Sequence, residues 1–297
     1  MKPAPFEYYA PTSVAETVAL LEQHGPEAKL LAGGQSLVPL LNMRLARPTV
    51  VVDVGRVSGL DYVREESGAL AIGAMTSQRT IERSELVEQR LPLLRAATRL
   101  VGHPQIRNRG TVGGSIAHAD PAAEYPAVAL ALGAQMRVVG PGDDRTIDAA
   151  DFFVTYLTTA LEPSDVLTEV RMPLLADGAG WSIVEVARRH GDFALAGAVV
   201  TLSVDGDSIK APRVVLFGVS ATPLRVREAE ERLVGGSPNE ALFKEAGKVV
   251  SDVIDEPLSD IHATAEFRRH LAGVMAQRGL AEAAGRAGYM PANQHDT

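Results

Sequence analysis

The chain contains no cysteine, and this absence is the first limit on its chemistry. Without cysteine it forms no disulfide, performs no thiolate catalysis and ligates no iron–sulfur cluster through thiolates of its own. The lack of cysteine is also compatible with a reducing compartment.

Long apolar runs and an excess of basic residues are also missing. No apolar run approaches the roughly 18 residues of a membrane-spanning helix. The N-terminal stretch from Met1 to Phe6 lacks the hydrophobic segment of a secretion signal. A net charge of -8 without a basic stripe argues against binding to nucleic-acid phosphates. We therefore expect a cytoplasmic protein with no membrane span and no nucleic-acid partner.

A chain of 297 residues with 46% apolar side chains is expected to fold into more than one lobe. We expect an N-terminal lobe at 1–55, a second lobe at 56–176 and a C-terminal domain at 177–290. The predicted helices are 14–24, 37–45, 76–86, 91–101, 122–132, 224–233, 239–250 and 262–279. The predicted strands are 28–32, 50–54, a hairpin over 60–73, then 135–139, 166–172, 181–186, 194–204 and 213–219. We place a second hairpin turn at 143–144 and a linker at 174–180.

Two diglycine segments carry the strongest functional signal. Gly33 and Gly34 follow the predicted strand at 28–32, and Gly113 and Gly114 follow about eighty residues later. Glycine permits positive φ and a close approach of the backbone to a ligand, and successive free N–H groups form an anion cradle. Two such cradles suggest a diphosphate ligand. A plain turn between strand and helix remains an alternative for Gly33 and Gly34 taken alone.

The stretch from His103 to Pro121 indicates a function more strongly than the first diglycine does. It combines three glycines, two prolines and many polar side chains between two predicted helices. Ordering such a segment costs conformational entropy that a simple connector would not need. The first diglycine, Gly33 and Gly34, matches neither the G-x-G-x-x-G fingerprint nor a P-loop.

The pairing of residues 32–37 with residues 105–115 resembles the flavoprotein (medium) subunit of molybdenum hydroxylases. This family includes aerobic carbon monoxide dehydrogenase and the FAD domain of xanthine dehydrogenase. A loop over 188–193 in the C-terminal part is also similar to the family, so the resemblance covers nearly the whole chain. It implies an α+β protein with an FAD-binding fold of the vanillyl-alcohol-oxidase/PCMH type, made of two α/β lobes. A C-terminal lobe with a three-stranded antiparallel sheet and helices would follow.

The resemblance also implies a role in electron transfer. FAD would be held by this chain, two [2Fe–2S] clusters by a small subunit and a molybdenum–pterin (molybdopterin) centre by a large subunit. Electrons would pass from the clusters through FAD to an external acceptor. The complex would be a dimer of heterotrimers that oxidises an N-heterocycle, an aldehyde or carbon monoxide. No catalytic residue and no metal ligand is assigned to this chain.

Site residues follow from the same resemblance. Backbone N–H groups of both diglycine segments would hold the diphosphate, with added hydroxyl donors. Glu124, where the family usually has Asp, and Asp120 would bind the ribityl or ribose hydroxyls. Leu167 would pack beside the cofactor, and Phe193 would flank the flavin ring. The full predicted set is Leu31, Ala32, Gly33, Gly34, Gln35, Ser36, Leu37, Val101, Ile106, Thr111, Gly113, Gly114, Ser115, Asp120, Glu124, Leu167, Asp192 and Phe193.

Several alternatives stay open at this stage. The chain could be a self-contained FAD-dependent oxidase of the vanillyl-alcohol-oxidase type, or a scaffold without cofactor. Phe193 could fill the core of the C-terminal lobe instead of facing the flavin. Gln35 stands where carbon monoxide enzymes have His, and Ser115 where Asn is frequent, which weakens the assignment to carbon monoxide. The histidines His103, His118 and His190 are not spaced as metal ligands.

Overall fold

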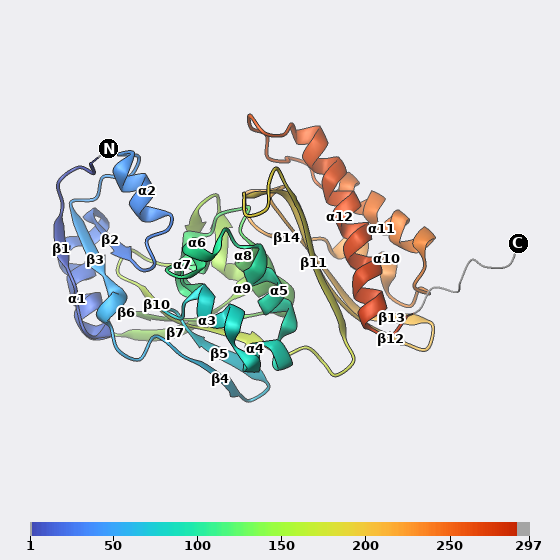
Figure 1. Cartoon of the computed structure of the whole chain (residues 1–297), viewed down its shortest axis with the longest axis horizontal. Helices are drawn as coiled ribbons and strands as arrows, with labels where there is room; N and C mark the ends of the chain where they lie inside the picture. The colour runs from blue at the N-terminus through green and yellow to red at the C-terminus, as the bar shows by residue number, and fades with distance from the viewer. Residues whose placement is uncertain (1, 290–297) are drawn as a thin grey trace, which may run out of the picture. The chain divides into compact units, whose positions relative to one another are not determined.

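The computed structural model describes residues 2–289, which divide into two compact units. Among the described residues, the N-terminal unit consists of residues 2–120 and 132–174, and the C-terminal unit of residues 121–131 and 175–289. The final change of unit falls inside the predicted linker. Residues 121–131, which the sequence analysis assigned to the second lobe, cluster with the C-terminal unit. Figure 1 labels the elements in chain order.

The N-terminal unit begins with a three-stranded parallel sheet in the order β1-β3-β2. Ser13 starts α1 because its Oγ accepts a hydrogen bond from the Glu16 amide, as a Ser N-cap does. Val18 and Leu21 of α1 then pack against Val50 and Val52 in the core of this lobe. The elements are β1 (Glu7–Tyr9), α1 (Val14–His24), η1 (Gly25–Glu27), β2 (Ala28–Leu31), α2 (Leu37–Asn42), β3 (Val50–Asp53) and η2 (Val54–Arg56).

The second sheet of this unit is antiparallel and has the strand order β4-β5-β10-β6-β7. Strand β10 lies at its centre, and α7 packs on β5 and β10. A two-stranded hairpin, β8-β9, completes the unit. The strands are β4 (Val63–Glu66), β5 (Ala69–Gly73), β6 (Gln135–Gly140), β7 (Asp143–Asp148), β8 (Phe153–Thr155), β9 (Thr158–Thr159) and β10 (Val166–Pro173). The helices are α3 (Gln78–Arg83), α4 (Glu85–Arg90), α5 (Pro92–Leu100), α6 (Pro104–Arg107), α7 (Val112–His118) and α9 (Ala149–Phe152).

The stretch from His103 to Pro121, to which the sequence analysis assigned no element, contains α6 and α7. Two local predictions are wrong, and each has a physical reason. The predicted helix 76–86 is two helices, because the Ser84 side chain caps α4 and ends the preceding turn. The second hairpin turn lies at Gly142, whose φ of +69° suits a tight turn, and Asp143 already belongs to β7.

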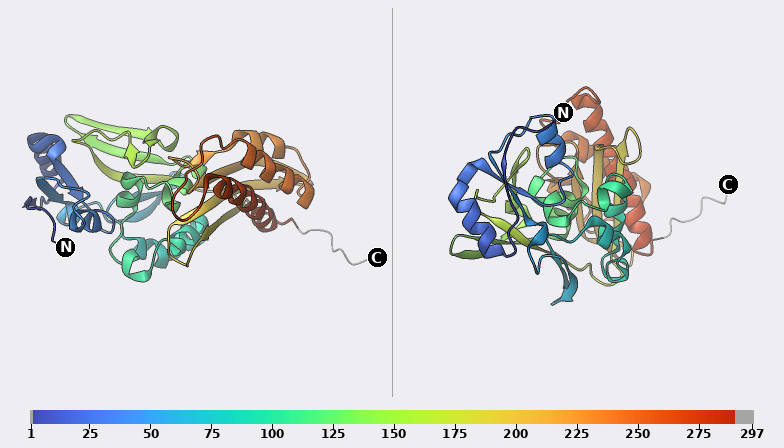
Figure 2. Two further views of the ribbon diagram at one scale, coloured as in Figure 1. Left: turned by 90° about the horizontal axis from the view of Figure 1, so that it is seen from above. Right: turned by 60° about the vertical axis from the view of Figure 1, so that its left-hand side comes forward.

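The C-terminal unit has a four-stranded antiparallel sheet in the order β11-β12-β13-β14, one strand more than predicted. The added strand, β14, occupies the first two residues of the predicted helix 224–233, and the helix itself begins at Arg227. Helices α10, α11 and α12 cover one face of this sheet (Figures 1 and 2), and Met275 and Leu280 are buried there beside Val200. The elements are α8 (Glu124–Leu132), β11 (Gly180–Ala187), β12 (Ala194–Asp205), β13 (Ser208–Phe217), β14 (Leu224–Arg225), α10 (Arg227–Leu233), α11 (Glu240–Asp252) and α12 (Ala265–Arg286).

The segment Pro121–Ala131 is fastened to this unit at both ends. The Gly218 amide donates to the Pro121 carbonyl at 2.7 Å, and Arg213 Nη1 donates to the Ala131 carbonyl at 2.9 Å. The chain therefore leaves the N-terminal unit after Asp120 and returns to it at Leu132.

Candidate functional site

The first diglycine forms the loop between β2 and α2. Gly34 has a φ of +74°, a left-handed conformation that favours glycine. A Cβ at Gly34 would also lie 3.1 Å from Val38 Cγ2 and 3.2 Å from Leu31 Cδ1. Both the conformation and the tight packing therefore require a residue without a side chain at this position.

The N–H groups of this loop are available for a ligand. For the part of the chain that the structure describes, the amides of residues 33–36 have no intrachain acceptor. The loop carbonyls are engaged instead: Gln35 Nε2 donates to the Gly33 carbonyl at 3.0 Å, and the Val38 amide donates to the Gly34 carbonyl at 3.0 Å. The Ser36 side chain makes no capping hydrogen bond. Because the loop is half-buried and its donors are unused, it is a ready anion-binding cradle.

The second diglycine lies directly against the first loop. A Cβ at Gly33 would stand 2.2 Å from the carbonyl oxygen of Arg109 and 2.8 Å from Gly110 Cα. A Cβ at Gly114 would stand 3.5 Å from Ala32 Cβ. The structure thus brings the two sequence motifs together, and glycine at position 33 is what allows their backbones to approach.

The amides of the second diglycine are used inside the protein. Thr111 caps α7, and its Oγ1 accepts a hydrogen bond from the Gly114 amide at 3.0 Å. The Gly113 amide donates to the Ala74 carbonyl at 2.9 Å, and the Ser115 amide donates to the Thr111 carbonyl at 3.1 Å. In this structure these three amides therefore have acceptors within the chain, and their part in holding the diphosphate stays a prediction. The segment braces the first loop, while Gly114 and Ser115 stay half-buried on the accessible side of α7.

The backbone of Ala74 connects the second diglycine segment to the strand that carries Leu167. The Ala74 amide donates to the Thr168 carbonyl at 2.9 Å, while the Ala74 carbonyl holds Gly113. Thr168 lies where the register of β10 against β6 shifts, between Leu167 and Glu169, and its hydroxyl donates to the Arg137 carbonyl. Leu167 itself is buried. The bulge therefore sets the position of a predicted cofactor contact relative to α7.

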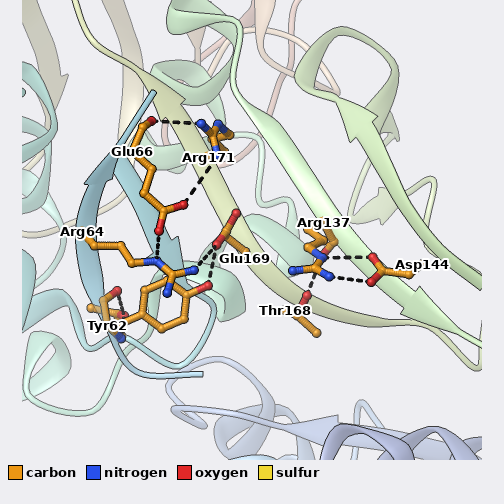
Figure 3. A network of polar contacts seen from close by, with 9 residues as sticks. Tyr62, Arg64, Glu66, Arg137, Asp144, Thr168, Glu169 and Arg171 are labelled. Atoms are coloured by element: carbon orange, nitrogen blue, oxygen red, sulfur yellow. Dashed lines mark hydrogen bonds and ion pairs between the residues drawn. The ribbon is translucent and has the colours of Figure 1, made fainter. Parts of the chain in front are cut away.

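A polar network beside this bulge was not foreseen from the sequence (Figure 3). The Tyr62 hydroxyl donates to Glu169 Oε2 at 2.5 Å, and Arg64 Nη2 lies 3.6 Å from the same oxygen. Burial, together with the bond to Glu169, raises the pKa of Tyr62 to about 12. Tyr62 thus keeps its proton, and the network ties β4 to β10. The residues come from strands far apart in sequence and form no motif, so only the fold reveals them.

The remaining predicted residues lie in two places. Val101 ends α5, and Ile106 lies in α6 just beyond Gly102, whose φ is +47°. Asp120 follows α7 in the N-terminal unit. Glu124, buried at the start of α8, belongs to the C-terminal unit. Neither Asp120 nor Glu124 is free of interactions in the structure.

Asp192 and Phe193 lie in the loop between β11 and β12, also in the C-terminal unit. The Phe193 side chain is 70% exposed. The alternative in which Phe193 fills the core of the C-terminal lobe is therefore wrong. Gly191, with a φ of +85°, makes the turn that presents this loop.

The described residues contain no group of three or more His, Cys, Asp or Glu side chains suited to a metal ion. Among these same residues no helix is long and apolar enough to cross a membrane.

A glycine loop with unused amides, braced by a second glycine segment, defines a nucleotide- or phosphate-binding protein. Comparison with known proteins identifies the class further. Residues 4–175 match the family described as the FAD binding domain in molybdopterin dehydrogenase, and residues 181–283 match the CO dehydrogenase flavoprotein C-terminal domain. The chain belongs to this family of FAD-binding oxidoreductase subunits, and the predicted α+β fold is confirmed.

Relatives of known function resemble the chain over nearly its full length. It is 41% identical to the carbon monoxide dehydrogenase medium chain of Hydrogenophaga pseudoflava, covering 94% of this chain and 97% of the relative. It is 39% identical to the 6-hydroxypseudooxynicotine dehydrogenase complex subunit alpha of Paenarthrobacter nicotinovorans, covering 97% of each. Among solved structures, carbon monoxide dehydrogenase from Hydrogenophaga pseudoflava matches with a TM-score of 0.94 and 40% identity, covering 96% of this chain and 99% of that one.

Proposed function

We propose that this chain is the electron-transfer subunit of a molybdenum hydroxylase complex. In this proposal, a small partner subunit with [2Fe–2S] clusters delivers electrons, and FAD bound to this chain passes them to an external acceptor. The observation that carries the proposal is the Gly33–Ser36 loop with its unused amides, braced by the segment from Arg109 to Gly114. We keep the prediction that the complex works in the cytoplasm.

The residues of the loop fit the cofactor that the family binds. The FAD diphosphate is an anion, and the amides of Gly33, Gly34, Gln35 and Ser36 offer it donors without any charged side chain. The Ser36 hydroxyl adds a further donor at the start of α2. A side chain at Gly33 would displace the brace, so the cradle depends on the shape of the backbone.

The bound flavin supplies redox chemistry that no side chain of this chain offers. The protein's own part is to hold and orient it. The amide cradle would fix the diphosphate, Val101, Ile106 and Leu167 would supply apolar contacts, and the exposed Phe193 would cover the ring. Asp120 and Glu124 would accept hydrogen bonds from sugar hydroxyls.

The subunit role is favoured over the self-contained oxidase by two observations. The chain has no cysteine for a cluster or a covalent flavin link. The relatives are named as a medium chain or as one subunit of a dehydrogenase complex, and each is matched almost completely. Their names cover carbon monoxide and a nicotine derivative, and a further relative is a caffeine dehydrogenase subunit. For this complex we keep an N-heterocycle, an aldehyde or carbon monoxide as candidate substrates.

Cofactor content tests the proposal. The purified chain should carry about one flavin, released as FAD by acid precipitation and identified by chromatography. Gly33→Ala should lose most of this FAD, because the added Cβ would overlap the Arg109 carbonyl and push the brace away. Gly285→Ala is the matched control, since a Cβ there meets nothing within 4 Å. It should keep full FAD content.

Three results would contradict the proposal. They are release of FMN instead of FAD, flavin that stays on the polypeptide after precipitation, and a wild-type chain that binds no flavin when FAD is added. Retention of FAD by Gly33→Ala would instead contradict the assignment of the cradle to this loop.

A further inference from the structure

Arg107, near the candidate site, donates hydrogen bonds from all three nitrogens of its guanidinium group. It lies in α6 within the second motif and is 6% exposed. Its Nε and Nη2 donate to the two carboxylate oxygens of Glu82, each at 3.2 Å. Its Nη1 donates to the carbonyl oxygens of Val101 at 2.9 Å and Gly102 at 3.2 Å. The fork of the guanidinium thus joins a carboxylate on α3 to the turn that follows α5.

Glu82 is prepared to hold this arginine. Arg79 Nη1 also lies 3.1 Å from Glu82 Oε2, and Arg95 Nε donates to the Glu82 backbone carbonyl at 2.9 Å. Although burial opposes ionisation, the bonds from Arg107 and Arg79 hold the pKa of Glu82 below its usual value. Glu82 is therefore a charged, partly buried partner for the buried Arg107, and the pair is bidentate, a geometry that lysine cannot reproduce.

The carbonyls that Arg107 holds belong to a tight turn that requires glycine. Gly102 has a φ of +47°, and a Cβ there would lie 3.2 Å from Ile106 Cβ. Beyond Ile106 the chain runs into the backbone of Arg109 and Gly110, on which Gly33 rests. The Gly110 amide donates to the Ile106 carbonyl at 2.7 Å, which makes this stretch continuous. A shift of the turn would therefore be passed to the brace of the anion cradle.

We propose that Arg107, held by Glu82, is a positioning residue for the flavin site. It sets the Val101–Gly102 turn and, through α6, the backbone that supports the Gly33 loop. The inference rests on the proposed function, because it concerns the same site. It assigns no contact between Arg107 and the cofactor. Arg107 acts through the backbone that it holds.

The test measures FAD affinity of the full chain, stripped of flavin and titrated with FAD while flavin fluorescence is recorded. Arg107→Met should weaken binding tenfold or more and blur the vibrational structure of the flavin absorption band. Arg232→Met is the matched control, because Arg232 also makes a bidentate pair with a carboxylate, Glu245, but both residues lie in the C-terminal unit and do not contact this turn. Its FAD dissociation constant should stay within about twofold of that of the wild type.

A double variant separates positioning from general stability. Arg107→Met alone leaves the partly buried Glu82 with only Arg79 as an ionic partner, and this lowers stability. Adding Glu82→Gln removes that charge, so the melting temperature should recover. The FAD affinity should stay weak, because the two backbone carbonyls still lack their donor. Recovery of both properties together would show that Arg107 is only structural and would overturn the inference.

If Arg107→Met does not fold, Arg107→Lys serves as the test variant for the inference. Lysine keeps the charge opposite Glu82 but cannot bond the carboxylate and both carbonyls at once. Hydrogen exchange of the amides in 101–106 should rise and FAD affinity should fall in this variant. Wild-type affinity in a folded Arg107 variant overturns the inference and leaves the proposed function intact. A wild-type chain that binds no FAD overturns the proposed function itself.

Discussion

At the scale of single residues, the candidate site depends on two positions where the residue is glycine and carries no side chain. Gly33 lets two backbone segments touch, and Gly34 supplies a left-handed turn. Neither glycine contributes a functional group, and the donors come from the peptide backbone. This explains why the motif contains no Lys and no G-x-G-x-x-G spacing, although it provides anion-binding groups of the same kind.

Glu185 in β11 is a residue whose burial has a measurable effect on stability. Its Oε2 is buried and has no hydrogen-bond partner among the described residues. Burial raises the pKa of Glu185 to about 7. The folded state therefore resists ionisation, whereas the unfolded chain ionises near the ordinary value. The stability that the protonated Glu185 carboxyl contributes is fully present below about pH 4.5 and is lost as the pH rises towards 7.

Glu185→Gln should remove this pH-dependent loss. We expect the variant to gain stability relative to wild type between pH 4 and pH 8, by at most about 3 kcal/mol. Urea unfolding at both pH values, followed by circular dichroism, measures the difference. Glu228→Gln, at an exposed carboxylate of α10, should show no such trend. Equal pH profiles for Glu185→Gln and wild type would contradict the burial argument.

At the scale of elements, the loop between β11 and β12 is the part most open to test. Phe193 is 70% exposed and Gly191 turns the chain just before it. Arg188 Nη1 lies 2.9 Å from His262 Nδ1, so the loop is attached to the segment that precedes α12. A large aromatic side chain held in the open at a defined turn is suited to stacking on a planar ligand.

Phe193→Ala should change the flavin absorption spectrum and the rate of acceptor reduction. Its melting temperature should hardly move, because substitutions at exposed positions usually change stability by less than about 0.5 kcal/mol. Val234→Ala, at another exposed apolar position, should change neither the spectrum nor the rate. A large loss of stability with an unaltered spectrum would contradict the assignment of this loop to the flavin.

The elements also show how far the sequence could be interpreted. Helix starts with a polar cap, such as Ser13 for α1 and Asn239 for α11, could be predicted because the capping bond is local. The split at Ser84 was missed, since a cap inside a helical pattern looks like an ordinary helical residue. The two-residue strand β14 was missed because it is defined only by its pairing with β13.

For the site, the sequence indicated the two motifs but not which of them has amides with acceptors inside the protein. The diglycines are visible as composition, whereas the commitment of the Gly113 amide to Ala74 depends on a contact between distant segments. Arg107 lies within the motif at 105–115, but the motif does not reveal that Arg107 pairs with Glu82. Its partner is 25 residues away on another helix, and no spacing rule connects them.

At the scale of the whole molecule, two features bear on assembly with other subunits. The chain has no cysteine for a cluster and no described metal-binding group. Its surface also exposes Val154, Tyr156 and Leu157 within the β8-β9 hairpin, at 60%, 55% and 42%. Clustered exposed apolar side chains often mark protein–protein contacts. These features support a role inside a larger assembly.

We expect the native protein to copurify with a small iron–sulfur subunit and a large molybdenum subunit. Native mass spectrometry of the complex from the source cells should give the mass of a dimer of heterotrimers. Metal analysis should find iron and molybdenum in the complex and neither metal in the separated chain. Activity of the free monomer with the oxidised substrate would contradict this assembly.

The order of the strands has a consequence for the time that folding takes. Gly73 of β5 pairs with Glu169 of β10, so the central strand of the sheet is made roughly a hundred residues after its neighbour. At about 5 to 20 residues per second, the ribosome needs on the order of 5 to 20 s to deliver it. The segment Pro121–Ala131 waits about as long, because Arg213 and Gly218, which fasten its ends, are also synthesised roughly a hundred residues after the ends they hold. During translation the nascent chain therefore holds an unfinished sheet and an undocked helix, and it cannot complete its N-terminal unit before β10 has left the ribosome.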